Sequence, residues 1–352
     1  MPDAGRRPIL LARYLALAWC GLIVYGSLHP FAGWRNNGVR LLAFLDADWP
    51  RYWTGFDLLA NVAVYLPLGF FLTLALRPWP GRYTAPSLAV LLAALLSLGM
   101  ESLQNWLPSR VPSNLDLLCN TLGGLLGAAW AQWRGHHFFR QLATLEKHLL
   151  APVPHAELGL TLLGLWLLVP LSPETLLFGA GNLRHWIDLT PLLPFSAERF
   201  AASEAVITAS QTVAIGLILR SLIAHRRQAA FAIPLFIALG LGVRTLGAAV
   251  LISPQEALAW LTTGATQGLL GGLLATALLL WLPRRVAVGL AILALVAGTV
   301  LVNLTPANPY SAAALAAWRQ GHFLNFNGLT RLVASLWPFL CLPFLLLSLR
   351  RP

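Results

Sequence analysis

Long apolar runs, separated by short stretches rich in proline and charged residues, recur along the whole chain. The runs are about 17–25 residues long, and an apolar helix of about 20 residues crosses a hydrocarbon core of about 30 Å. Short alternating strands, typical of a membrane barrel, are not the pattern here. The sequence therefore predicts an all-α, polytopic transmembrane helical bundle with about ten spans, at 11–28, 57–76, 84–104, 116–133, 157–170, 203–222, 229–251, 257–282, 286–304 and 331–349.

The spans also follow a repeated order. Leu98–Leu103 resembles Leu241–Leu246, and the next span in each case carries Gly-Leu-Leu-Gly, at Gly124–Gly127 and at Gly268–Gly271. A Leu-X-Pro segment closes a span three times, ending at Pro30, Pro173 and Pro306. This pattern predicts a four-helix domain at 1–140, a degenerate four-helix repeat at 150–285 and a final helix pair at 286–352. The alternative is chance resemblance between helices built from few residue types.

Composition supports a membrane location. The chain is 57% hydrophobic and 11% charged, with a mean hydropathy of +0.69 and a net charge of +11. Fifteen Arg and Lys side chains fall on one side of the predicted spans and eight on the other, which places both termini in the cytoplasm. The cations are expected to meet membrane lipids, and no nucleic-acid partner is expected. Many Arg and a single Lys suggest a bacterial genome and thus the bacterial inner membrane.

Polar side chains within apolar spans concentrate between residues 56 and 127. A polar group facing lipid is costly, so such groups turn inward and often mark a site. Three sets share helix faces by their spacing, namely Asp57, Asn61 and Tyr65, then Ser97, Glu101 and Gln104, then Asp116 and Asn120. Arg110 is the single cation of the loop between the second and third sets, and it is a candidate to pair with Glu101, Asp57 or Asp116. At equivalent positions the second repeat has Arg244 opposite Glu101 and lacks the acids, so the chemistry is assigned to the first.

These residue types define candidate roles. Glu101, Arg110 and Asp116 are the candidate catalytic residues, because an ionisable pair is a costly way to fix packing. The candidate ligand-binding residues are Asp57, Asn61, Tyr65, Gln104 and Asn120. The competing interpretation is structural: amides join membrane helices by hydrogen bonds, and Asp57 and Asp116 cap helix starts. Pro67, Gly69, Gly123 and Gly127 predict a kinked helix and close helix packing beside this region.

No metal or cofactor site is predicted. Cys20, Cys119 and Cys341 lie in separate spans without paired spacing, which favours neither a disulfide framework nor a cysteine metal site. The sequence contains no phosphate-binding loop, dinucleotide fingerprint, HExxH or GxSxG motif.

Several short blocks resemble the signature of the VanZ-like family, over residues 15–133. They are the segment Asn61–Phe70, then Glu101 to Gln104, then Arg110, and then Asp116 to Gly124. The family is a bacterial membrane domain named for a member associated with teicoplanin resistance. The resemblance implies that its characteristic positions are occupied here by Asn61, Pro67, Gly69, Glu101, Gln104, Arg110, Asp116, Asn120 and Gly124.

Four functions remain open from the sequence. The first is binding or remodelling of a lipid-linked or glycopeptide-like envelope ligand at the outer leaflet, with Arg110 holding an anionic group. The second is an intramembrane enzyme acting on a lipid-linked substrate, with Glu101 as acid or base. The third is a structural or assembly subunit. The fourth is a transporter, disfavoured because the polar groups cluster near one face of the membrane.

Overall fold

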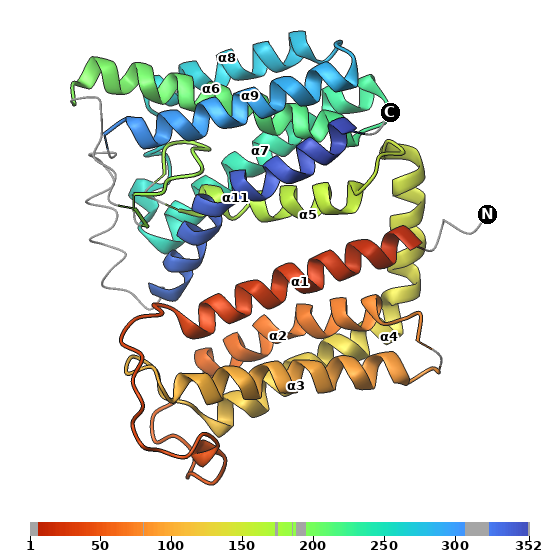
Figure 1. Ribbon diagram of the computed structural model, residues 1–352, viewed down its shortest axis with the longest axis vertical. Helices are drawn as coiled ribbons and strands as arrows, with labels where there is room; N and C mark the ends of the chain where they lie inside the picture. Colours follow the sequence, from red (N-terminus) through yellow and green to blue (C-terminus); the bar gives the residue numbers. More distant parts are fainter. Residues whose placement is uncertain are drawn as a thin grey trace. The chain divides into compact units, whose positions relative to one another are not determined.

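The computed structural model describes residues 6–79, 81–172, 175–184, 186–187, 195–306 and 324–350 (Figure 1). This part of the chain folds into ten α-helices and three short 3₁₀ helices, without a β-strand, which confirms the all-α prediction. The helices are α1 (Arg6–Leu28), α2 (Gly55–Ala75), α3 (Thr84–Gln104), α4 (Asn114–Leu149), α5 (Ala156–Trp166), α6 (Ala197–Leu222), α7 (Arg226–Leu251), α8 (Thr263–Leu279), α9 (Arg284–Leu304) and α11 (Leu324–Arg350). The 3₁₀ helices are η1 (Ala43–Leu45), η2 (Val169–Leu171) and η3 (Pro254–Glu256).

Seven of these helices are long and apolar enough to cross a membrane, namely α1, α2, α3, α6, α7, α9 and α11. The predicted spans at 157–170 and 257–282 correspond to the shorter apolar stretches Ala156–Leu171 and Thr263–Leu279. The span predicted at 116–133 is the first half of α4, which continues to Leu149. Hydropathy ends a span at Arg134, but residues 136–149 contain neither glycine nor proline, so the helix itself continues.

The chain divides into two compact units, Met1–Glu146 and Lys147–Pro352, and each is described by itself. The finer division of the second unit into a repeat and a helix pair stays a prediction.

Glycines let α4 approach the backbone of α2 in the first unit. A Cβ added at Gly123 would lie 2.3 Å from the Val62 carbonyl oxygen, and one at Gly127 would lie 1.9 Å from that of Leu66. Gly69 faces the Gly124 carbonyl oxygen in the same way, at 2.1 Å. The predicted close approach is confirmed, because no residue with a side chain fits these positions without a shift of the helices.

An equivalent crossing joins α6 and α8 in the second unit, where the two helices run side by side (Figure 1). An added Cβ at Gly268 would lie 2.3 Å from the Ala205 carbonyl oxygen, and one at Gly272 would lie 2.9 Å from that of Ala209. An added Cβ at Gly271, which belongs to the Gly-Leu-Leu-Gly match, would meet nothing within 4 Å. The geometric counterparts of Gly123 and Gly127 are therefore Gly268 and Gly272, whereas the sequence match pairs Gly124 with Gly268 and Gly127 with Gly271.

The three Leu-X-Pro segments share a contact that the sequence did not suggest. Each leucine is the last residue of α1, η2 or α9, and the carbonyl oxygen of each X residue accepts from an arginine. Arg110 donates to His29, Arg244 to Ser172 and Arg184 to Thr305. Pro173 itself lies outside the described residues.

The proline of these segments explains why an arginine can bind the end of the preceding helix. A helix carbonyl normally accepts from the N–H four residues later, and proline has none. Gly26 and Val302 precede Pro30 and Pro306 by four residues, and their oxygens accept from Arg110 (2.9 Å) and Arg184. The guanidinium thus replaces the missing amide, and its charge also suits the negative end of the helix dipole.

Candidate functional site

The end of α3 is joined to the start of α4 by a buried carboxylate. Glu101, which is 3% exposed, accepts a hydrogen bond on Oε2 from the backbone N–H of Ser113 at 2.8 Å. The Ser113 hydroxyl in turn accepts from the N–H groups of Leu115 and Asp116, each at 3.2 Å, and so caps α4. Glu101 therefore takes the place of a capping-box carboxylate, although it comes from another helix.

This arrangement leaves Asp116 free for a contact between helices. Ser113 and Asp116 have the Ser-x-x-Asp spacing of a capping box, in which Asp116 would accept from the Ser113 N–H. Because Glu101 accepts that hydrogen, Asp116 Oδ1 instead accepts from Asn61 Nδ2 at 2.9 Å. The half-buried Asn61–Asp116 contact joins the second turn of α2 to the first turn of α4, about two turns from the Gly127 crossing contact.

Two polar atoms near this contact make no hydrogen bond of normal geometry to a described residue. Asn120 donates through Nδ2 to Ser97 Oγ at 3.0 Å, but its Oδ1 makes no hydrogen bond to any described residue. Tyr65 lies close to Ser97 and Glu101, yet its hydroxyl makes no hydrogen bond of normal geometry in the described chain. Asn120 is 5% exposed and Tyr65 is 3% exposed. A buried polar atom without a partner is uncommon and costs about 1–3 kcal/mol, so a ligand is one explanation for it.

Arg110 and Gln104 bind the end of α1. Gln104 donates to the Ser27 carbonyl oxygen at 3.1 Å, and Arg110 donates through Nε and Nη2 to His29. The expected pairing of Arg110 with Glu101, Asp57 or Asp116 is wrong for this structure, in which none of these described carboxylates forms an ion pair with it. Burial lowers the pKa of the Arg110 guanidinium, and the nearby Glu101 charge acts in the opposite direction.

Asp57 departs most from the predicted cluster. Its side chain is exposed and accepts from the backbone N–H of Thr54 at 3.0 Å, while Thr54 Oγ1 accepts from the Asp57 N–H at 3.2 Å. This is a complete capping box at the start of α2. The structure thus places Asp57 in the helix-capping role that the sequence left open.

The six residues that meet between α2, α3 and α4 are called the polar cluster below: Asn61, Tyr65, Ser97, Glu101, Asp116 and Asn120.

The loop between α1 and α2 contacts the segment that joins α3 to α4. Asn105 donates to the Leu41 carbonyl oxygen and Asn114 to that of Ala47, both at 2.7 Å.

Several of these contacts were not predicted from the sequence. Asn105, Ser113 and Asn114 were absent from the predicted site. The Ser-x-x-Asp spacing was a usable signal for Ser113. No local pattern marks Asn105 or Asn114, because their partners belong to a loop more than sixty residues away.

The fold defines the class of protein: a multi-pass helical membrane protein with a buried polar cluster in its first unit. Residues 14–135 match the family model described as VanZ/LLP1, so the first unit carries a VanZ-like domain, as the sequence blocks at 15–133 predicted. Comparisons with curated proteins and with solved structures gave no match.

Proposed function

We propose that the VanZ-like unit binds the polar head of an envelope amphiphile, either a lipid-linked precursor or a glycopeptide-like molecule. Two buried atoms that make no hydrogen bond of normal geometry to a described residue, Asn120 Oδ1 and Tyr65 Oη beside Ser97, carry this proposal. The protein would lie in the bacterial inner membrane with both termini in the cytoplasm, which puts the polar cluster in the outer leaflet.

The available groups favour a particular ligand chemistry. A tyrosine hydroxyl donates and accepts, whereas an amide oxygen only accepts. Glu101 and Asp116 are the nearest acidic groups, while Arg110 is already bonded to α1. A head that presents hydroxyl or amide N–H groups, such as a glycan or a peptide, therefore fits better than a bare phosphate. The earlier idea that Arg110 holds an anionic group receives no support from its contacts.

Removal of the Tyr65 hydroxyl tests the proposal. The purified full chain would be titrated with two probes, an undecaprenyl diphosphate-linked muropeptide and teicoplanin, and binding followed by native mass spectrometry. Tyr65→Phe should weaken binding of one probe by about fivefold, as expected for loss of one hydrogen bond of about 1 kcal/mol. Tyr52→Phe removes a 94% exposed hydroxyl and is the matched control.

Two outcomes would overturn the proposal. The first is that the wild-type chain binds neither probe, and the second is that both Tyr→Phe variants weaken binding equally. Stability separates binding from packing, because Tyr65→Phe removes a buried hydroxyl that makes no hydrogen bond of normal geometry to a described residue. We expect its unfolding free energy to stay the same or to rise.

A structural role is the second candidate, favoured by the capping contacts of Glu101 and Arg110. In that case Glu101→Gln should lower stability and leave binding of both probes unchanged at matched folded protein. The enzymatic hypothesis with Glu101 as acid or base stays a prediction. It is tested by measuring whether the wild-type chain converts the muropeptide probe to a product, and whether Glu101→Gln abolishes that conversion.

A further inference from the structure

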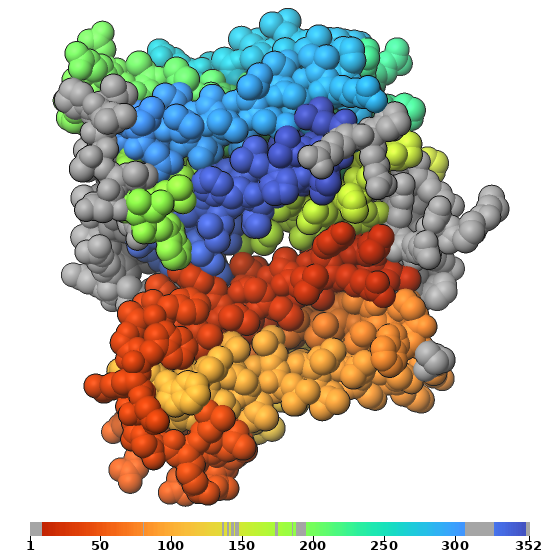
Figure 2. Space-filling model, in the orientation of Figure 1, coloured from red at the N-terminus to blue at the C-terminus, as the bar shows by residue number. Residues whose placement is uncertain are grey.

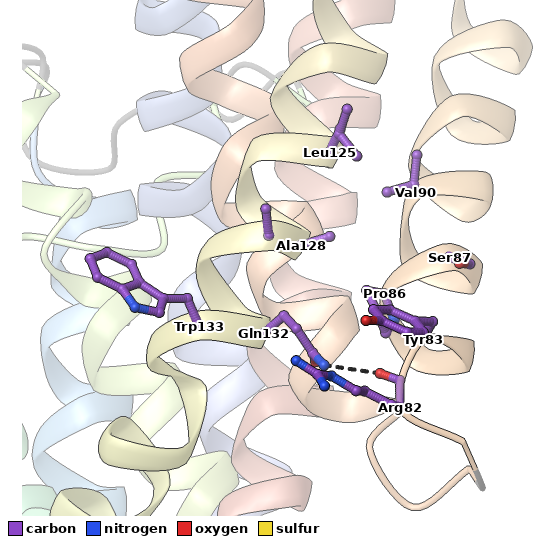
Figure 3. Close-up of a pocket in the computed structure, with 10 residues that line it drawn as sticks. Arg82, Tyr83, Pro86, Ser87, Val90, Leu125, Ala128, Gln132 and Trp133 are labelled. Carbon is purple, nitrogen blue, oxygen red and sulfur yellow. Dashed lines mark hydrogen bonds between the residues drawn. The ribbon is translucent and has the colours of Figure 1, made fainter.

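A groove of about 930 Å³ opens between α3 and α4, at the end of these helices away from Glu101 and Asn120 (Figure 3). Residues of the first turns of α3 line one side and residues 125–133 of α4 line the other. Pockets that hold small ligands range over about 300–1,000 Å³, so the groove is large enough for part of a lipid. Figure 2 shows this unit in red to yellow.

Polar and cationic groups gather at one end of the groove. Arg82, Tyr83, Ser87 and Gln132 line it there, and Gln132 Nε2 donates to the Arg82 carbonyl oxygen at 3.0 Å (Figure 3). The Arg82 guanidinium lies 5.4 Å from the centre of the Tyr83 ring. The Arg134 guanidinium lies 4.5 Å from the ring of the neighbouring Trp133, which is a further lining residue.

Negative charge is missing from the sequence around the groove. No Asp or Glu occurs between Asp57 and Glu101, or between Asp116 and Glu146. Arg82 and Arg134 are therefore not neutralised by acidic neighbours along either helix. In addition, Tyr83, which precedes α3, provides no side-chain cap for it.

The other end of the groove is apolar. Val90, Leu125, Ala128 and Ala129 line it, and Val90 and Leu125 each lie about two turns away from the polar end. Two helical turns correspond to about 10 Å, which is a substantial part of one leaflet of a hydrocarbon core of about 30 Å. The groove thus has a cationic mouth that continues into an apolar channel along the helices.

We infer that this groove binds one anionic phospholipid, with its phosphate at Arg82 and one acyl chain along Val90 and Leu125. Charge complementarity selects the lipid, because a zwitterionic lipid of the same chain length gains less from Arg82, which forms no ion pair with a described residue. The site is independent of the polar cluster and of the ligand proposed for it.

Native mass spectrometry of the detergent-solubilised full chain tests the inference. The protein would be titrated with phosphatidylglycerol and, separately, with phosphatidylcholine of the same acyl chains. We expect a first adduct that favours phosphatidylglycerol, and an approximately fivefold loss of that preference in Arg82→Gln. Arg51→Gln removes an equal charge at the opposite end of the unit and should leave the preference unchanged.

A second pair of variants tests the shape of the groove. Ala129→Phe places a ring in the groove from an exposed position and should abolish the preferred adduct. Ala63→Phe adds the same ring at an exposed site on α2 outside the groove and should not. Equal adducts of the two lipids, or equal losses in Arg82→Gln and Arg51→Gln, would overturn the inference. So would an Ala129→Phe variant that changes oligomeric state but keeps the adduct, because the groove would then be a protein interface.

Discussion

Gly127→Ala perturbs the helix crossing that supports the polar cluster. The added Cβ would lie 1.9 Å from the Leu66 carbonyl oxygen, whereas ordinary contact begins at 3.4 Å, so α4 and α2 must separate by about 1.5 Å. A gap of about 0.5–1 Å already removes a quarter to a half of each dispersion contact. Overpacking of this kind costs about 1–3 kcal/mol. This overpacking cost is partly offset by the higher helix propensity of alanine, which stabilises a Gly→Ala variant by about 1 kcal/mol.

Gly99→Ala in α3 is the matched control, because an added Cβ there meets nothing within 4 Å. It should therefore show the propensity gain alone. We expect unfolding free energies, measured by SDS titration in mixed micelles, to differ between the two variants by about 1–3 kcal/mol, which is the overpacking cost, because the propensity gain is common to both variants and cancels.

The same variant should also weaken binding of the head-group probe, because separation of α2 from α4 lengthens the Asn61–Asp116 contact. Gly127→Ala and Gly99→Ala variants of equal stability would refute the close helix crossing. A destabilised Gly127→Ala variant with unchanged probe affinity would instead refute the link between the crossing and the polar cluster.

Three further predictions concern the capping contacts. Ser113→Ala should lower the unfolding free energy by about 0.5–2 kcal/mol, because the cap of α4 is lost, and circular dichroism should report reduced helicity. Glu101→Ala should destabilise more than Glu101→Gln in the same SDS titration, because glutamine still accepts from the Ser113 N–H; equal losses would contradict the contact. Arg110→Lys should lower the unfolding free energy by about 1–3 kcal/mol, because an ammonium group cannot donate to the Gly26 and His29 carbonyl oxygens in the planar geometry of a guanidinium. The control is Arg40→Lys, which changes an arginine in an exposed ion pair.

Hydrophobic patterning predicted helices well where their ends are marked locally. The span predicted at 84–104 coincides with α3, and the span at 286–304 lies within α9. The span predicted at 116–133 ends sixteen residues before α4 does, because loss of hydropathy ends a membrane span without ending a helix. Loop contacts, such as Asn114 with Ala47, were not predictable, since nothing near either residue encodes the other.

The residues of the candidate site also divide into those that helical spacing placed correctly and those whose partners depended on the tertiary fold. Helical spacing correctly grouped Asn61 with Tyr65 and Ser97 with Glu101, because spacing along a helix fixes the face. Asp57 shares the spacing but lies in the first, exposed turn of α2, where a cap is its nearest partner. Arg110 was expected to meet a carboxylate because opposite charges attract. In the fold, however, Pro30 leaves the Gly26 oxygen without an amide donor, and the guanidinium fills that need.

The sequence by itself determined the membrane class, the apolar helices, the VanZ-like blocks and the glycines that allow α2 and α4 to meet. These are local properties, set by composition and by periodicity over one or two turns. Only the tertiary structure decided which polar groups are satisfied. It paired Glu101 with Ser113 and placed an arginine on each of the three Leu-X-Pro segments from 72 to 121 residues away. Hydrogen-bond partners at such separations depend on how helices pack, and the same packing left Tyr65 and Asn120 each with an atom that makes no hydrogen bond of normal geometry to a described residue.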